Sequence, residues 1–270
     1  MILVIGATGN VGRHVVPLLL ESGAAVRALV RDPGNARLPE GVEAVRGDLT
    51  RPETVEAALD GVESVFLVWP GFAAEQAAPV VKLIAGHARR VVYLSAMAAA
   101  DMFHGEVERL IRESGLEWTF LRPGGFAVNT LMWAGQIREG VVRWPYALAG
   151  RSLIHERDIA AVAALALTGD GHAGKAYDLT GPSVVTQAEQ VRIIGEAIGR
   201  PARYEELPRE AAREQLLAAW GEATFVDSAL DYWASIVAEP EPVTRTVEEL
   251  TGVPARTFHQ WAADHADDFR

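Results

Sequence analysis

The chain begins with a short apolar run that leads through three glycines into an apolar-periodic helix. Residues 2–5 have the continuous apolar character of a parallel strand that is buried on both faces. Gly6, Gly9 and Gly12 follow at three-residue spacing. Such a turn leaves backbone N–H groups free at the positive end of a helix, where a pyrophosphate can approach without meeting a Cβ atom. The pattern therefore predicts a dinucleotide site, although its spacing differs from the standard G-x-G-x-x-G; the alternative is a glycine turn without a ligand.

Apolar runs alternate with helical patterns along the first 200 residues. This alternation is typical of repeated βαβ units, and right-handed crossovers on both faces then give a doubly wound (Rossmann) parallel sheet of the α/β class. We predict strands at 2–5, 25–30, 42–45, 64–68, 91–94, 119–121 and 176–179. We predict helices at 10–22, 75–86, 103–114, 156–167 and 186–198. Beyond residue 208 the chain is mostly helical, with a Pro-rich break at 239–243.

Composition excludes several classes of protein. The chain of 270 residues is 49% apolar, yet no apolar run approaches the ~20 residues that cross a membrane, and we expect no signal peptide. It has no cysteine, so disulfides and thiolate metal sites are excluded, and its seven histidines show no metal-ligand spacing. A formal net charge of −11 argues against nucleic-acid binding. We therefore expect a cytoplasmic protein that holds no metal and acts on a small molecule, as a monomer or homodimer.

Three segments resemble a known family. The sequences of residues 6–13 (GATGNVGR), 26–32 (VRALVRD) and 47–49 (GDL) are similar to the atypical short-chain dehydrogenase/reductase superfamily, and most similar to its NmrA-like group. The segments LRPGGF at 121–126 and IHERDIA at 154–160 extend the match. The resemblance implies an NAD(P)-binding core over 1–125. It also implies a small C-terminal substrate lobe over 126–270, interleaved with the end of the core in a single compact unit.

The choice of cofactor depends on the residues that follow the second and third strands. At Arg31 the resemblance places the adenosine ribose, and an arginine there suits a 2′-phosphate, so NADP(H) is predicted and NAD(H) is second choice. Asp32 would reverse the preference if it turned inward, and a solvated Arg31–Asp32 surface pair is the alternative. Asp48 either bonds the adenine amino group or caps a helix. The predicted cofactor contacts are Gly6, Thr8, Gly9, Asn10, Val11, Gly12, Arg31, Asp48, Leu49, Val68, Trp69, Ser95, His104, Pro123, Gly125 and Phe126.

The catalytic residues depart from the superfamily pattern. Most short-chain dehydrogenases use Tyr-x-x-x-Lys, in which the lysine lowers the pKa of the tyrosine, and none of the five tyrosines here has a lysine four residues on. The segment 103–108 aligns with an NmrA-like Lys-Gly-Glu-Val-Glu pattern, which puts His104 in the place of the lysine and Ala100 in that of the tyrosine. Either His104 is the proton donor or the protein reduces no carbonyl. Ser95 matches the superfamily serine; the alternative is a strand-end hydroxyl that bonds the backbone.

Aromatic residues on segments expected near the nicotinamide predict the substrate pocket, although each is individually typical of a core as well. The predicted pocket residues are Trp69, Phe72, Phe126, Trp133, Trp144 and Tyr146. The sequence thus predicts an NADP(H)-dependent oxidoreductase that transfers hydride to a planar apolar substrate such as a quinone, enone or polycyclic ketone. The alternatives are a non-catalytic NADP(H)-sensing regulator and a non-redox enzyme of the same fold.

Overall fold

The computed structural model describes residues 1–71, 74–97, 99 and 103–270, and the chain divides into two compact units. The first unit consists of Met1–Pro123, Glu156–Leu179 and Thr246–Val253. The second consists of Gly124–His155, Thr180–Arg245 and Pro254–Arg270. The chain therefore leaves the first unit after Pro123 and returns to it twice.

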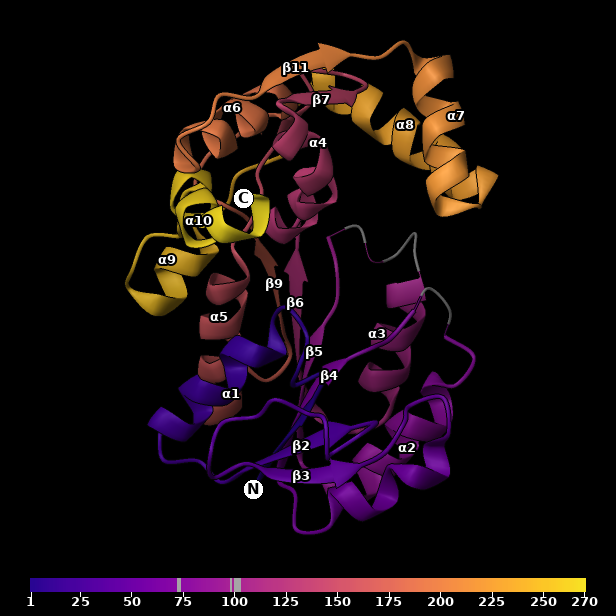
Figure 1. Ribbon diagram of the computed structural model, residues 1–270. Coiled ribbons are helices and arrows are strands. Elements are labelled where there is room, and N and C mark those ends of the chain that lie inside the picture. The colour runs from indigo at the N-terminus through magenta and orange to yellow at the C-terminus, as the bar shows by residue number, and fades with distance from the viewer. Residues whose placement is uncertain (72–73, 98, 100–102) are drawn as a thin grey trace. The chain divides into compact units, whose positions relative to one another are not determined.

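A seven-stranded sheet forms the centre of the first unit, in the order β3-β2-β1-β4-β5-β6-β9 with every pairing parallel (Figure 1). Its strands are β1 (Ile2–Ile5), β2 (Val26–Val30), β3 (Glu43–Arg46), β4 (Ser64–Val68), β5 (Arg90–Leu94), β6 (Glu117–Pro123) and β9 (Lys175–Leu179). Strand order reverses between β1 and β4, and ligands of such sheets bind at the carboxyl ends of the strands beside this switch point. The predicted doubly wound Rossmann fold is confirmed.

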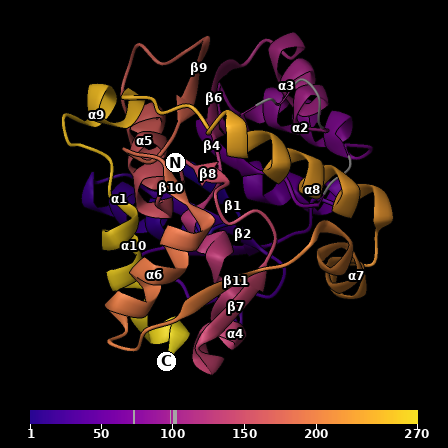
Figure 2. The ribbon, with the colours of Figure 1, turned by 90° about the horizontal axis from the view of Figure 1, so that it is seen from above.

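Helices cover both faces of the sheet. Helices α1 (Gly12–Glu21) and α5 (Glu156–Thr168) pack together on one face, and α2 (Ala77–His87) and α3 (Phe103–Glu113) pack together on the other (Figures 1 and 2). Central strands such as β1 are apolar throughout because both of their faces are buried. Each large apolar side chain that is fully buried there contributes roughly 1.5–3 kcal/mol. The short segments η1 (Pro52–Thr54), η2 (Glu56–Leu59) and α9 (Thr246–Thr251) complete the unit.

Most predicted bounds differ from the structure by one or two residues, and the differences at β6 and α1 have physical reasons. Strand β6 extends beyond the apolar run at 119–121 because its polar ends are paired: Glu117 with Arg89 and Arg90, and Arg122 with Glu108. Helix α1 begins at Gly12 instead of residue 10, since the residues before it form the glycine turn.

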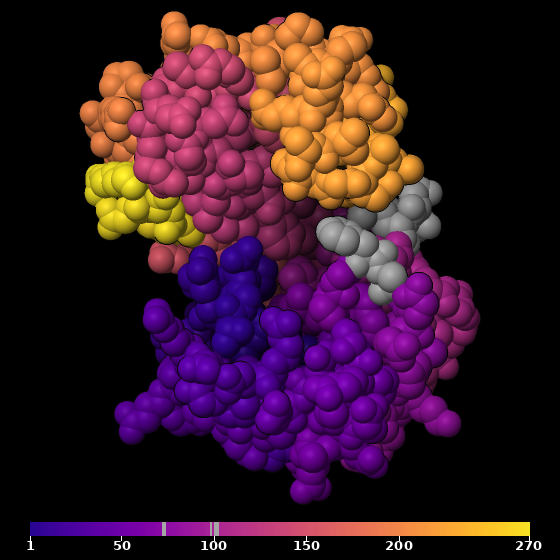
Figure 3. Space-filling view, turned by 45° about the vertical axis from the view of Figure 1, so that its right-hand side comes forward, coloured from indigo at the N-terminus to yellow at the C-terminus, as the bar shows by residue number. Residues whose placement is uncertain are grey.

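The second unit is mostly helical around an aromatic core. Its helices are η4 (Ala127–Trp133), α4 (Ala134–Glu139), α6 (Gln187–Ala197), α7 (Arg209–Trp220), α8 (Ala223–Ala238), α10 (Phe258–Asp264) and η5 (Ala266–Phe269). Two small sheets pair β7 (Val141–Trp144) with β11 (Arg203–Glu206), and β8 (Gly150–Arg151) with β10 (Val185–Thr186). Helices α7 and α8 pack against each other and lie at the surface, orange in Figure 3. Among the described residues, no helix combines the length and the apolar character that a membrane crossing needs.

Candidate functional site

The glycine turn between β1 and α1 uses its three glycines differently. Gly6 has φ +85°, and a Cβ atom there would lie 2.9 Å from the Cβ of Val68 on β4. A Cβ atom on Gly12 would lie 2.1 Å from the carbonyl oxygen of Gly6. At Gly9 the nearest atom to such a Cβ is that same oxygen, at 3.2 Å, and nothing else lies within 4 Å. The turn itself therefore requires Gly6 and Gly12, whereas the bare backbone at Gly9 leaves room for a ligand.

Backbone donors gather at this turn. The Gly9 N–H donates to the oxygen of Gly6, and the Arg13 N–H donates to that of Gly9. Across the described part of the chain, no acceptor pairs with the amides of Asn10, Val11 and Gly12 at the head of α1. Free amides at a helix N-terminus, beside a glycine that admits close approach, fit the pyrophosphate of a dinucleotide. Thr8 and Asn10 are exposed there, and the Val11 side chain is buried.

Three arginines surround a cavity of about 320 Å³ at the carboxyl ends of β2 and β3. The side chains of Arg31, Arg46 and Arg51 are exposed, and within the described residues none of them forms a hydrogen bond or ion pair. Asp32 turns toward its own loop, where its carboxylate accepts from the Gly34 N–H at 3.2 Å and from the Asn35 amide at 2.5 Å. The sequence identified Arg31 but missed Arg46 and Arg51. The signal for Arg46 was weak, because it ends β3, a strand with a single half-buried apolar residue among exposed ones.

Asp48 lines the same cavity and caps a turn. Its Oδ1 accepts from the Thr50 N–H at 2.9 Å and from the Thr50 hydroxyl at 2.8 Å. These hydrogen bonds, aided by the charges of Arg51 and Arg31, outweigh partial burial and lower the pKa of Asp48. The helix cap that was one alternative for Asp48 does not form, because η1 has Arg51 as its N-cap with no side-chain cap bond, and Asp48 instead closes the turn before it; contact with adenine stays a prediction. Leu49 is buried in the core of the first unit.

Two polar contacts join β5 to α3 beside the carboxyl end of the strand. In the first, the Tyr93 hydroxyl lies 2.7 Å from Nδ1 of His104. Tyr93 is fully buried and His104 is half-buried. Burial lowers the pKa of His104 and outweighs the opposite influence of the Glu108 charge. The shift favours the neutral form of His104 at neutral pH, and its role as proton donor stays a prediction.

The second contact centres on Glu108, which is only 1% exposed. The Ser95 hydroxyl donates to it at 2.6 Å, Arg122 donates at 2.8 Å and 2.5 Å, and Arg112 at 2.7 Å. Burial alone would raise the pKa of Glu108, but the hydrogen bonds from Arg122 and Ser95 and the two arginine charges lower it overall. The bond of Ser95 to a carboxylate, instead of the backbone, engages its only proton, so a catalytic role for Ser95 stays a prediction without support from this geometry.

The residues predicted around the nicotinamide fall in both units, so each is described within its own. Pro123 ends β6 in the first unit, where Trp69 is buried in the core. In the second unit a Cβ atom on Gly125 would meet the ends of the Arg151 and Leu153 side chains, which would have to shift to admit it. Phe126 forms a bridge with Ile154. The predicted pocket residue Phe72, and Ala100 in the place of the family tyrosine, lie outside the described residues.

Trp133 and Trp144 belong to the core of the second unit, 3% and 5% exposed, with their rings 5.9 Å apart in an edge-to-face arrangement. Both indole N–H groups are buried, and neither has a hydrogen-bond partner among the described residues. Such donors are costly to leave unpaired. Tyr146 has φ +55°, which is strained for an aromatic residue, and its hydroxyl accepts from Arg209 at 3.1 Å. These features mark the cluster as a candidate ligand-binding region, and its role as the substrate pocket stays a prediction.

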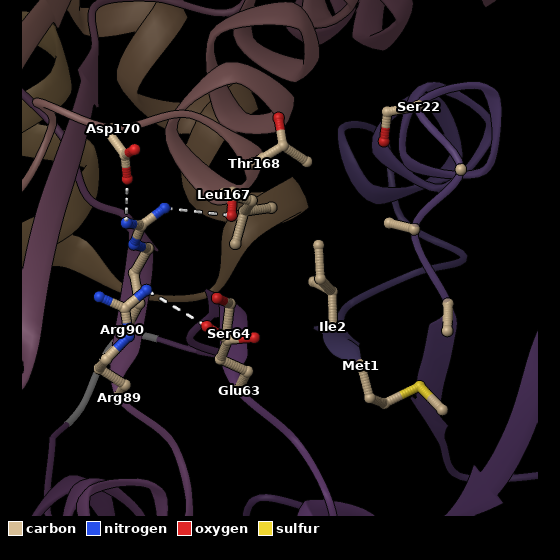
Figure 4. Close-up of a pocket in the computed structure, with 13 residues that line it drawn as sticks. Met1, Ile2, Ser22, Glu63, Ser64, Arg89, Arg90, Leu167, Thr168 and Asp170 are labelled. Atoms are coloured by element: carbon tan, nitrogen blue, oxygen red, sulfur yellow. Dashed lines mark hydrogen bonds and ion pairs between the residues drawn. The ribbon is translucent and has the colours of Figure 1, made fainter.

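A second cavity of about 320 Å³ lies at the opposite, amino edge of the sheet (Figure 4). Arg90 is buried there and donates to the carbonyl oxygen of Gly169 at 2.6 Å, just beyond the C-terminus of α5. Arg89 pairs with Glu63 and Glu117. These arginines are engaged in holding strands and helix together, unlike those at the carboxyl edge.

The fold and the glycine turn define a dinucleotide-binding protein of the Rossmann type. The family model described as NAD(P)H-binding matches residues 6–170. Two similar proteins cover the whole chain and are covered over 99% of their own length. They are (4-alkanoyl-5-oxo-2,5-dihydrofuran-3-yl)methyl phosphate reductase of Streptomyces griseus subsp. griseus, 42% identical, and NAD(P)H azoreductase of Xenophilus azovorans, 39% identical.

Solved structures agree with this assignment. The NADPH-dependent quinone oxidoreductase of Escherichia coli has a TM-score of 0.82 at 26% identity, over 98% of this chain and 99% of that one. The triphenylmethane reductase of Citrobacter sp., solved with NADP(H), has a TM-score of 0.83 at 23% identity, over 98% and 100%. The chain belongs to the NAD(P)H-binding family, within the NmrA-like class of atypical short-chain dehydrogenases/reductases, and is an NAD(P)H-dependent oxidoreductase.

Proposed function

We propose that the protein is an NADPH-dependent reductase that delivers hydride to a planar conjugated acceptor, such as a quinone, an enone or a polycyclic ketone. The observation that carries the proposal is the cavity lined by Arg31, Arg46 and Arg51, whose side chains form no hydrogen bond or ion pair among the described residues although Asp48 and Glu53 share the lining, together with a glycine turn that has free amides. NADPH supplies the hydride when bound. We further propose that the protein acts in the cytoplasm as a monomer or homodimer.

The preference for NADPH over NADH follows from charge. A 2′-phosphate adds negative charge and acceptor oxygens, and guanidinium groups bind phosphate through two parallel hydrogen bonds. A free ribose hydroxyl would call for an acidic partner. Asp32 is the nearest such residue in the sequence, and both of its carboxylate oxygens already accept from its own loop.

The acceptor class is supported by the relatives and by the second unit. The relatives are named as reductases of an unsaturated lactone phosphate, of azo compounds and of quinones. These are conjugated electron acceptors. The second unit supplies aromatic surface at Trp133, Trp144 and Tyr146 and two indole N–H donors that an acceptor oxygen could satisfy.

Calorimetry with Arg31→Ala tests the cofactor assignment. The variant should bind NADPH more weakly by about 1.5 kcal/mol, the lower end for a charge-assisted hydrogen bond, because the site is exposed. Binding of NADH, which lacks the phosphate, should be unchanged. Arg192→Ala, on the exposed surface of α6, is the matched control and should change neither affinity. If the variant loses equal affinity for NADPH and NADH, Arg31 does not bind the 2′-phosphate.

A second candidate function is a non-catalytic NADPH sensor. It is favoured by one sequence fact, that no tyrosine is followed by a lysine four residues on, and by the bond that engages the Ser95 proton with Glu108. Such a sensor would bind NADPH tightly and oxidise it with none of a panel of quinones, enones and aromatic ketones.

A further inference from the structure

The Tyr93–His104 contact is held in place by packing from three elements. Tyr93 lies in β5, entirely buried, with its ring edge-to-face against Phe120 of β6. His104 lies in the first turn of α3, and its ring packs at 4.0 Å between centroids against Phe103. The hydroxyl of Tyr93 and Nδ1 of His104 are 2.7 Å apart. Both rings are thus fixed, so the hydrogen bond between them determines where the histidine proton resides.

The direction of this hydrogen bond follows from which group holds its proton. Burial, with the nearby charge of Glu108 adding to it, raises the pKa of Tyr93 far above its ordinary value, so the hydroxyl stays protonated. Burial also keeps His104 neutral, although Glu108, one turn further along α3, acts in the opposite sense. The Glu108 charge is itself met by Arg122 of β6 and Arg112 of α3. The buried Tyr93 O–H has no other acceptor among the described residues, so it donates to Nδ1, and the single proton of neutral His104 lies on Nε2.

We propose that Tyr93 is the positioning residue that holds His104 as a neutral imidazole protonated on Nε2, ready to donate a hydrogen bond to the oxygen of the acceptor. This proposal rests on the proposed reductase function. It assigns His104, the candidate catalytic residue, one protonation state and one tautomer. In place of the superfamily tyrosine–lysine pair, the protein then has a tyrosine–histidine pair, in which the histidine donates the hydrogen bond to the acceptor.

This arrangement stabilises charge without passing on a proton. An acceptor that gains hydride is left with an anionic oxygen, and the Nε2–H of His104 can bond to it as a fixed electrostatic partner. If His104 released that proton, Nδ1 would have to take one from Tyr93, leaving a tyrosinate buried in an apolar core near Glu108. The oxygen therefore takes its proton from water: an O–H bond of water breaks, an O–H bond forms on the product, and hydroxide remains in solvent.

Nitrogen-15 NMR of histidine-labelled protein tests the tautomer without any turnover. The His104 resonances are assigned by their loss in His104→Gln. In the wild-type protein at neutral pH we expect Nε2 protonated, Nδ1 unprotonated, and a titration below the ordinary histidine pKa of about 6.5. In Tyr93→Phe we expect a mixture of the two tautomers and a titration that moves up toward that value, because the neutral form has lost its donor. A wild-type proton on Nδ1, or an unchanged spectrum in Tyr93→Phe, overturns the proposal.

The chain offers a matched control. The Tyr177 hydroxyl lies 2.9 Å from Nδ1 of His172, a second tyrosine–histidine pair at the amino end of β9. Tyr177→Phe removes the same kind of bond and should alter only the His172 resonances.

Kinetics separates the positioning role from the proposed function. Tyr93→Phe should lower kcat roughly 2- to 10-fold, the weight of one neutral hydrogen bond, with NADPH affinity unchanged, while Tyr177→Phe keeps full turnover. Full turnover in Tyr93→Phe, despite mixed tautomers, overturns the positioning role. If none of the acceptors tested supports oxidation of NADPH by the wild-type protein, the proposed function fails. The NMR spectra still decide which tautomer His104 adopts.

Discussion

The two compact units differ in which buried donors lack a partner among the described residues: in the first it is Nε of Arg27, whose guanidinium otherwise donates to Ala58 and Asp60, and in the second it is a pair of indole N–H groups. In the first unit the buried carboxylate of Glu108 accepts from Ser95, Arg112 and Arg122, so its charge is fully engaged. In the second unit the buried indole N–H groups of Trp133 and Trp144 have no partner among the described residues. The first unit holds the free amides and the arginines that we propose for the cofactor. The second presents aromatic side chains, which suit a substrate that differs from one reductase to another.

The largest effect should come from the glycine turn of the first unit. Gly9→Val places a branched side chain where the pyrophosphate must approach, so we expect binding of both NADPH and NADH to be lost in calorimetry. Gly86→Val is the matched control, because nothing lies within 4 Å of a Cβ atom at that position of α2. Retained NADPH affinity in Gly9→Val, in a folded protein, would place the cofactor elsewhere.

The next effect concerns the stability of the first unit. Removing the buried carboxylate leaves the charges of Arg112 and Arg122 uncompensated, so Glu108→Ala should lower the free energy of unfolding by about 3 kcal/mol, the low end for a broken buried pair because both arginines are partly solvated. Urea denaturation measures it. Glu106→Ala, on the exposed face of the same helix, is the control and should change stability by no more than about 0.5 kcal/mol.

The same carboxylate predicts a pH dependence. Because the pKa of Glu108 in the folded protein is below its ordinary value of 4.5, its contribution is present above that pH and is lost as the pH falls through the lower, folded value. The difference in stability between wild type and Glu108→Ala should therefore narrow on acidification below 4.5. A difference that stays constant there would show that the charge of Glu108 does not stabilise the fold.

The smallest effect should come from the aromatic core of the second unit. If the Trp144 indole N–H bonds the acceptor, Trp144→Phe should raise KM for the acceptor roughly 2- to 10-fold while NADPH affinity stays unchanged. Trp118→Phe removes an indole that stacks on Phe120 in the first unit and serves as the control. If Trp144→Phe has the same KM for the acceptor as the wild-type protein, Trp144 has only a structural role.

The difference between the units also explains what the sequence could predict. Strands such as β1 and β4 were located to the residue, and the glycine turn was recognised, because buried parallel strands and tight turns restrict the residue types that fit them. Arg31 was found because it follows a recognisable strand. Arg46 was missed because β3 has only one half-buried apolar residue among exposed ones, so its end carries little hydrophobic signal.

Side-chain pairing was beyond the reach of the sequence. Tyr93 was examined for a lysine four residues on, yet its partner is His104, eleven residues away across a connection between strand and helix. The same register brings Ser95 to Glu108, since residues two apart on a strand and four apart on a helix share a face. Only the packing of α3 against the sheet brings these pairs together, and no local pattern encodes it.

The most direct test of the account is turnover of NADPH deuterated at its transferable position, with an enone as acceptor. If the protein is the proposed reductase, NADPH is oxidised, deuterium appears on carbon in the product, and the new O–H or exchangeable hydrogen comes from water. Tight binding of NADPH, with no oxidation by any enone, quinone or aromatic ketone, would contradict the reductase and leave a sensor in its place.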